Sequence, residues 1–202
     1  MLIKIGGVSV HFGFAAAVFF ACALNTDKWD VYAIGFAGIL LHELTHLFFM
    51  ALFGCRHFRF ELLPGGVRLS SEEAEALGYR ETMVVLLSAP VVNLLSGGVL
   101  WGCGRLALSF LLREAAAIHL TLGLANLLPL RFLDGGRAME MYLLDRYSDA
   151  AMLKITKLAD AICLILLTVS AVILTLRKTY LFSFYVFFQY CLFMTVISAK
   201  KN

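Results

Sequence analysis

The sequence predicts an all-α polytopic membrane protein with about six transmembrane helices and a small β-hairpin after the second. Three observations lead to this fold class. Hydrophobic residues make up 61% of the 202 residues, charged residues make up only 15%, and long apolar runs recur along the chain. A soluble domain is nearer a quarter charged, and about 20 apolar residues can cross a bilayer once. The chain therefore has room for about six crossings within a single domain, residues 1–202.

The predicted spans follow one another with short connections. They cover the apolar runs at 8–24, 31–54, 82–103, 114–130, 158–176 and 180–198. The first run could instead be the core of a signal peptide, because Lys4 precedes it and Ala21-Cys22-Ala23 ends it. We favour a span, because the run is longer than a typical signal core and a second span follows at once. We interpret Lys154, Lys157 and Asp160 as a polar edge at the start of a helix.

The basic residues are distributed unevenly over the connections. When successive connections are placed on alternate sides, 12 of the 17 Lys and Arg residues fall on the side of both termini. The other side receives Lys28, Arg105, Arg113, Arg177 and Lys178. The positive-inside rule then places both termini in the cytoplasm. The net charge of +3 is small and follows this topology, so we expect the lipid bilayer, and no nucleic acid, as a partner.

A hairpin pattern follows the second span. Apolar and polar residues alternate at 57–62 and again at 67–70, on either side of Pro64-Gly65-Gly66. This alternation around a Pro-Gly turn is typical of a β-hairpin, here over residues 58–70. We expect this hairpin to pair with an extended peptide segment, with Pro64, Gly65 and Gly66 forming its turn. The alternative is a plain connection at the membrane surface.

The second span contains three ionisable groups, in the sequence His42-Glu43-Leu44-Thr45-His46. His42 and His46 are four residues apart, so on a helix both imidazoles would share a face and could bind one Zn²⁺. Glu43 stands beside them, where it could act as a general base on a water molecule. Ionisable groups at membrane depth are costly and usually face a bundle interior, where they serve a function. The alternative is that both histidines only form hydrogen bonds across helices.

A catalytic zinc ion usually has three protein ligands, so the two histidines need a third. The candidates are His11, His57, His119 and a carboxylate that reaches back to membrane depth. Asp134 is the most prominent carboxylate, because it follows the break at Pro129 and precedes Gly135-Gly136, where the backbone could turn back. An Asp-Gly-Gly sequence alone is more often a turn than a ligand. We expect His119 to form hydrogen bonds and His11 to lie at the membrane interface.

These motifs resemble those of the site-2 protease family of intramembrane zinc metalloproteases. His42-Glu43-Leu44-Thr45-His46 resembles the zinc motif of that family, and the resemblance covers nearly the whole chain. Asn126-Leu127-Leu128-Pro129 with Leu133-Asp134-Gly135-Gly136 resembles its second motif, whose Asp supplies the third zinc ligand. The resemblance implies that Asp134 completes the zinc site and that Glu43 is the catalytic base. It also implies that Asn93, Asn126 and Pro129 lie near the active site, where they would bind substrate.

Further matches resemble one branch of this family, the stage IV sporulation membrane protease that processes a sigma-factor precursor. They are Val10-His11, Leu62-Leu63-Pro64-Gly65-Gly66, and Ser88-Ala89-Pro90 followed by Asn93. The sequence also departs from the family pattern. Ser88-Ala89-Pro90 stands where Ala-Gly-Pro is usual, Phe132 stands where a second proline is common, and the chain stops at Asn202 without the nucleotide-sensing domain of the sporulation enzyme.

The resulting interpretation is a zinc metalloprotease of a bacterial cell membrane. It would cleave a membrane-embedded or membrane-tethered protein near the cytoplasmic face, and a regulatory membrane protein could be a further partner. Two alternatives come from other functional classes. A divalent-metal transporter would also place His and Asp at membrane depth, although it has no need of Glu43 next to His42. A non-catalytic relative would only bind transmembrane helices, and the presence of every zinc and base position argues against it.

Overall fold

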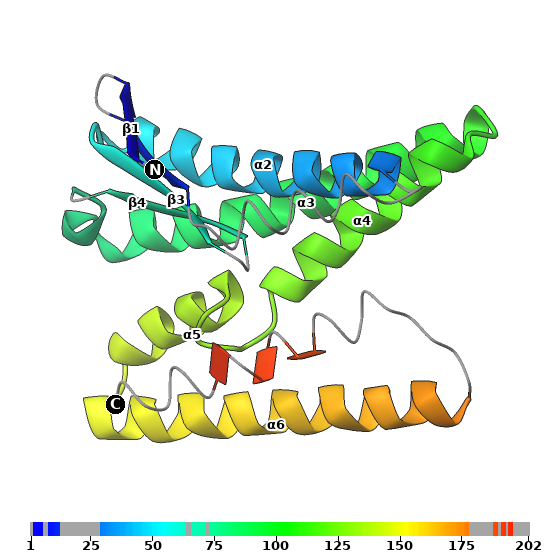
Figure 1. Ribbon diagram of the computed structural model, residues 1–202. Coiled ribbons are helices and arrows are strands. Elements are labelled where there is room, and N and C mark those ends of the chain that lie inside the picture. Colours follow the sequence, from blue (N-terminus) through cyan, green and yellow to red (C-terminus); the bar gives the residue numbers. More distant parts are fainter. Residues whose placement is uncertain are drawn as a thin grey trace. The chain divides into compact units, whose positions relative to one another are not determined.

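The computed structural model describes residues 2–5, 8–12, 29–63, 66–71, 73–177, 188–189, 191–192 and 194–195. The chain divides into two compact units, Met1–Ala125 and Asn126–Asn202, and each is described by itself. Figure 1 shows their helices and strands, and most of the described residues are helical. The prediction of one protease domain over residues 1–202 stays a prediction.

The first unit contains a four-stranded sheet in the order β1-β2-β3-β4. Its strands are β1 (Leu2–Ile5), β2 (Val8–Phe12), β3 (Phe58–Leu63) and β4 (Gly66–Ser71). β2 runs parallel to β3, and the other two pairs are antiparallel. The predicted first span therefore does not begin at residue 8. Ser9 and His11 alternate there with apolar residues, a period of two that suits a strand. Residues 13–24, the rest of that predicted span, lie outside the described residues.

Three long helices complete the first unit. They are α2 (Trp29–Leu52), α3 (Tyr79–Leu106) and α4 (Phe110–Asn126), and the single turn η1 (Glu73–Ala76) precedes α3. They correspond to the second, third and fourth predicted spans. α4 ends three residues before Pro129, which cannot donate the backbone hydrogen bond that a helix interior needs. Close packing fixes α3 against α4, because a Cβ atom on Gly123 would lie 2.9 Å from the carbonyl oxygen of Pro90.

The second unit contains α5 (Asp134–Leu144) and α6 (Asp149–Leu176). α6 matches the fifth predicted span but begins nine residues earlier than its apolar run. α5 was not expected from the sequence. Buried residues of α6, of the connection before α5 and of the C-terminal segment form an apolar core in this unit: Leu130, Leu133, Cys163 and Cys191. Most of the sixth predicted span, 180–198, lies outside the described residues.

Among the described residues, three helical segments are long and apolar enough to cross a membrane. They are Ala33–Leu52, Tyr79–Leu106 and Asp149–Leu176. With 17 residues, α4 is about 25 Å long, somewhat less than the roughly 30 Å hydrocarbon core of a bilayer. The coarse prediction of an apolar, mainly helical membrane protein agrees with these helices. The count of six spans stays a prediction.

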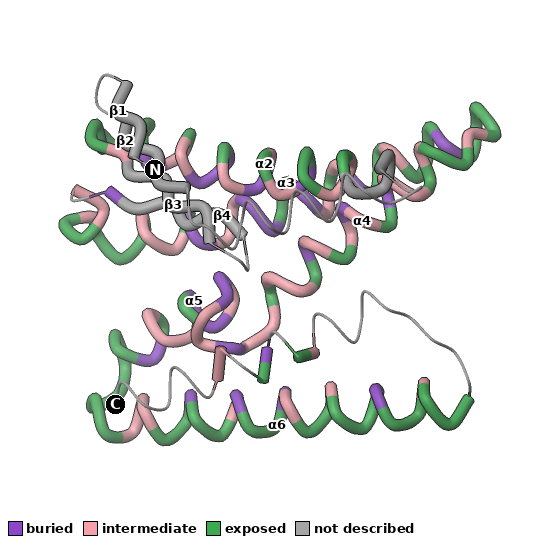
Figure 2. The backbone as a smooth tube through the Cα atoms, viewed as in Figure 1, coloured by how far each residue is buried: buried purple, intermediate pink, exposed green. Residues whose placement is uncertain are grey.

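α2 has one buried face and one exposed face. Gly38, His42, His46 and Met50 recur every four residues and are all buried. Leu40, Leu44 and Phe48 follow the same spacing on another face and are exposed, Phe48 to 60%. Figure 2 shows this alternation of buried and exposed residues along the long helices. The exposed stripe is apolar and the buried stripe carries both histidines, the distribution expected where the outside is lipid and polar groups face a bundle interior.

Candidate metal centre

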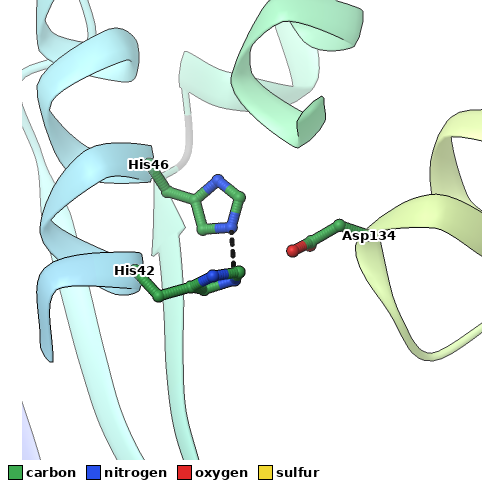
Figure 3. A group of neighbouring side chains, drawn as sticks. All are labelled: His42, His46 and Asp134. Carbon is green, nitrogen blue, oxygen red and sulfur yellow. Dashed lines mark hydrogen bonds between the residues drawn. The ribbon is translucent and has the colours of Figure 1, made fainter. Parts of the chain in front are cut away.

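His42 and His46 lie at the middle of α2. His42 is 13 residues after Trp29, about 20 Å along a helix that is about 36 Å long. Both side chains are buried, with 6% and 8% of their surface exposed. Because they are one helical turn apart, their Nε2 atoms approach to 3.3 Å, with the rings edge to face at 87° (Figure 3). The expected sharing of one helix face by the two imidazoles is therefore present.

The spacing of these two nitrogens fits a single metal ion. Zn²⁺ binds imidazole nitrogen at about 2.0–2.1 Å with tetrahedral angles, which puts two ligand nitrogens about 3.3 Å apart. The observed Nε2–Nε2 distance is 3.3 Å. The two imidazoles of α2 are thus already spaced as ligands of one ion, and this holds within the first unit alone.

The outer nitrogen of each ring has a partner on α3. His46 Nδ1 donates a hydrogen bond to the Val85 carbonyl oxygen at 2.8 Å, since a carbonyl can only accept. His42 Nδ1 lies 3.0 Å from the side-chain amide nitrogen of Asn93, and Asn93 Oδ1 lies 3.3 Å from Nδ1 of His119 on α4. Metal-binding histidines are commonly oriented in this way, by a hydrogen bond at the nitrogen that does not face the metal. The hydrogen bond expected of His119 is also present.

Glu43 and Asp134 supply the two carboxylates of the prediction. Glu43 is half-buried on α2, next to His42. Asp134 is the first residue of α5 and is buried, with 8% of its surface exposed. A carboxylate in the first turn of a helix is favoured by the helix dipole. Figure 3 labels Asp134 together with the two histidines, and each of the three residues offers one atom of a type that binds metal ions.

The Asp-Gly-Gly sequence is not the turn that was expected. It forms the first residues of α5 instead, and the glycines serve close packing within the second unit. A Cβ atom on Gly135 would overlap the Leu127 carbonyl, and one on Gly136 would overlap the Leu130 carbonyl. The backbone turns before these residues, where the Leu130 amide donates to the Leu128 carbonyl and the Leu133 amide to the Leu130 carbonyl, both at 2.8 Å.

A buried ion pair that the sequence did not indicate holds this turn to α6. Arg131 Nε donates to Asp160 Oδ2 at 2.6 Å, and the Arg131 backbone amide donates to Asp160 Oδ1 at 3.2 Å. Both side chains are less than a tenth exposed. Asp160 is therefore not part of a solvated polar edge with Lys154 and Lys157, which are exposed. Asp160 and the lysines are on one helix, but Asp160 is buried in its ion pair whereas the lysines are exposed.

The other predicted residues have varied surroundings. Asn126 is the last residue of α4, and Pro129 follows in the connection to α5; both are half-buried. Gly66 is the first residue of β4, whereas Pro64 and Gly65 lie outside the described residues. Of the other histidine candidates for a third ligand, His57 is exposed and contacts Glu73, with 2.5 Å between Nδ1 and Oε1. His11 has only its backbone described, in β2.

The fold and the paired histidines define a class: a membrane protein with a candidate metal centre at mid-depth of a helix. Among solved structures, the chain is similar to the Site-2 Protease from Methanocaldococcus jannaschii, with a TM-score of 0.65. The two are 22% identical, over 96% of this chain and 90% of that one. The chain therefore has the site-2 protease fold over nearly its whole length. No protein-family model matches the sequence, and no curated protein matches it.

Proposed function

We propose that this chain is an intramembrane metalloprotease of the site-2 protease family. One observation carries the proposal: two buried imidazoles on one helix of a site-2 protease fold have their Nε2 atoms 3.3 Å apart, with a glutamate next to one of them. This arrangement combines the ligand spacing of a metal site with a neighbouring carboxylate of the type that serves as a general base. A purely structural pair of histidines would need neither feature.

The metal is proposed to be Zn²⁺, held by His42, His46 and Asp134. Support comes from the nitrogen spacing on α2, from the burial of the Asp134 carboxylate, and from the preference of zinc for nitrogen and carboxylate ligands. When bound, such an ion would lower the pKa of a coordinated water toward 7 and polarise the scissile carbonyl group.

The residues of the chain would then divide the work of peptide hydrolysis. Glu43 takes a proton from the attacking water and later delivers it to the leaving amine. Its half-buried position suits a group that must meet both water and substrate. Asn126 and Pro129, at the end of α4 and in the connection after it, lie next to the segment that leads to Asp134 and would bind the substrate backbone.

The substrate is proposed to be a membrane-embedded or membrane-tethered protein, cut near the cytoplasmic face of a bacterial cell membrane. A helical substrate must unwind to expose its peptide bonds, and an edge strand can satisfy the backbone groups that unwinding frees. β4 is the last strand in the order of the sheet, and it begins at Gly66, the last residue of the predicted Pro64-Gly65-Gly66 turn. The resemblance to the sporulation branch makes a sigma-factor precursor the first substrate to try, and a regulatory membrane protein the first further partner.

The decisive experiment compares Glu43→Gln with the wild type. The purified variants are incubated with a sigma-factor precursor and with a panel of single-span membrane proteins, and bound zinc is measured in the same samples. We expect Glu43→Gln to lose cleavage by at least about 100-fold, the usual contribution of a general base, while zinc content stays near one ion. Glu75→Gln, at an exposed glutamate of η1, is the matched control and should cleave normally.

Two results would count against the protease. Near-wild-type cleavage by Glu43→Gln would remove the proposed base. Metal flux into vesicles that depends on His42, without cleavage of any substrate, would instead favour a divalent-metal transporter.

A further inference from the structure

The hydrogen bonds around His42 allow two consistent assignments of protons. In the first, His119 Nδ1 donates to Asn93 Oδ1, the Asn93 amide nitrogen donates to His42 Nδ1, and His42 therefore carries its proton on Nε2, facing His46. In the second, the Asn93 amide is rotated by half a turn. His42 Nδ1 then donates to the amide oxygen, and the amide nitrogen donates to His119 Nδ1.

Only the second assignment suits a metal ligand. An imidazole binds a metal through a nitrogen that carries no proton, so His42 can bind through Nε2 only if its proton lies on Nδ1. His46 meets this requirement without help, because the Val85 carbonyl always accepts from its Nδ1. His42 differs, since its partner is an amide whose two ends look alike in shape but have opposite roles.

We propose that Asn93 and His119 are positioning residues that fix the tautomer of His42, an inference that rests on the proposed role of His42 as a ligand. His119 accepts from the Asn93 amide nitrogen, which turns the amide oxygen toward His42 and holds the His42 proton on Nδ1. The chain of contacts joins three helices, from α2 through α3 to α4, within the first unit. Asn93 is fully buried, and the substrate contact predicted for it stays a prediction.

Packing holds His119 in place for this role. Its ring lies against α2 at Gly38, one turn before His42. A Cβ atom there would be 3.6 Å from His119 Cε1 and 3.7 Å from Nε2. His119 itself is 8% exposed. The ring thus has little room to withdraw from Asn93.

The experiment measures zinc affinity of the full chain in detergent micelles, by competition with a chelator, so it does not depend on cleavage. Asn93→Leu removes both ends of the amide and should weaken zinc binding by about 10- to 100-fold, the range typical of such oriented ligands. Asn93→Asp should bind zinc nearly as well as the wild type, because a carboxylate accepts from His42 Nδ1 in either orientation. Thr45→Val, which changes a buried polar residue beside the site that bonds only the Leu41 carbonyl, is the matched control.

The role of His119 is tested by combining variants. His119→Leu should weaken zinc binding in the wild-type background, because the amide is then free to rotate. It should have no further effect in the Asn93→Asp background, because a carboxylate has no donor end to direct. A purely structural role for His119 would give the same loss in both backgrounds, and thermal unfolding of each variant shows whether the fold is intact.

The outcomes separate this inference from the proposed function. Zinc binding that is lost in His42→Ala but unchanged in Asn93→Leu overturns the positioning role and leaves the metal site standing. Equal weakening by Asn93→Leu and Asn93→Asp overturns it as well. If the wild-type chain binds no zinc at all, the proposed function fails and the inference fails with it.

Discussion

The two compact units keep their buried polar groups in different ways. In the first unit, the buried groups around α2 include imidazoles and an amide that bond one another and a backbone carbonyl. In the second unit, the same task is done by full opposite charges, Arg131 and Asp160, at 2.6 Å. One site is a hydrogen-bond network of imidazoles and an amide, and the other is an ion pair.

The difference follows from what each site must do. A ligand histidine has to keep one nitrogen free of a proton, and neutral partners let the network choose which nitrogen that is without adding a charge. The Arg131 pair instead fixes a stretch of backbone, since Asp160 accepts from both the side chain and the main-chain amide of Arg131. A buried pair is costly to desolvate, but once formed it penalises any movement that would separate its charges.

The largest effect is expected from breaking the ion pair. Asp160→Leu leaves the Arg131 guanidinium buried without its partner, which should lower the free energy of unfolding by about 3 to 5 kcal/mol. Arg131→Met combined with Asp160→Leu removes both charges and should recover most of that loss. Thermal or denaturant unfolding in micelles gives both values. Lys157→Met, at an exposed charge on the same helix, should change little.

If the single and double variants lost equal stability, the pair would not be the source of the effect. Substrate cleavage by the same single and double variants is a second measurement. Because the pair holds the connection that leads to Asp134, the stable double variant should still cleave less than the wild type.

The sequence was most informative where the interactions are local. His42 and His46 are one turn apart on a helix long enough to span a membrane, so their shared face follows from helix geometry alone. The same reasoning failed for Asp160, because its partner is 29 residues earlier in the chain and no periodic pattern links the two. The partners of Asn93 on α2 and α4 were hidden for the same reason.

Local patterns also misled at two places. Gly135 and Gly136 suggested a turn, yet they are glycines because carbonyl groups of the preceding connection leave no room for a side chain. The run that begins at Val8 is apolar enough for a span, but its first five residues pair with β3 as a strand. In both cases tertiary contacts, which the sequence does not display, decided the local structure.

A smaller effect is expected at β4, where the polar groups concerned are the backbone amides of an edge strand. Neighbouring residues of a strand point their amides in opposite directions, so Arg68→Pro and Leu69→Pro form a matched pair. In one of these two proline variants, the lost amide is one that donates to β3, and that variant should destabilise the sheet. In the other proline variant, the lost amide faces away from β3, so thermal stability should stay unchanged. We expect this stable variant to lose cleavage by about tenfold, the worth of one hydrogen bond to the substrate, while zinc binding stays unchanged.

Wild-type cleavage by the variant that remains stable would leave the 58–70 segment as a plain connection. A loss of cleavage that only follows loss of stability would have the same meaning. Either result would mean that the backbone amides of β4 do not contribute to cleavage.

The smallest effect is expected at Glu73, a charged group outside the spanning helices. Its hydrogen bonds are open to water, in contrast to those of the two buried sites. Its carboxylate accepts from the Ser71 hydroxyl at 2.6 Å and contacts His57, and these bonds, Ser71 first, lower its pKa from 4.5 to about 2. A lowered pKa stabilises the folded state above pH 4.5, and this contribution is lost as the pH falls from 4.5 toward 2. Ser71→Ala should therefore raise the pKa of Glu73 toward 4.5, which a carboxyl-carbon NMR titration can follow. Because Glu73 is open to solvent, cleavage and stability at neutral pH should hardly change. A large loss at neutral pH would instead mean that this exposed cluster is coupled to the buried network of α2.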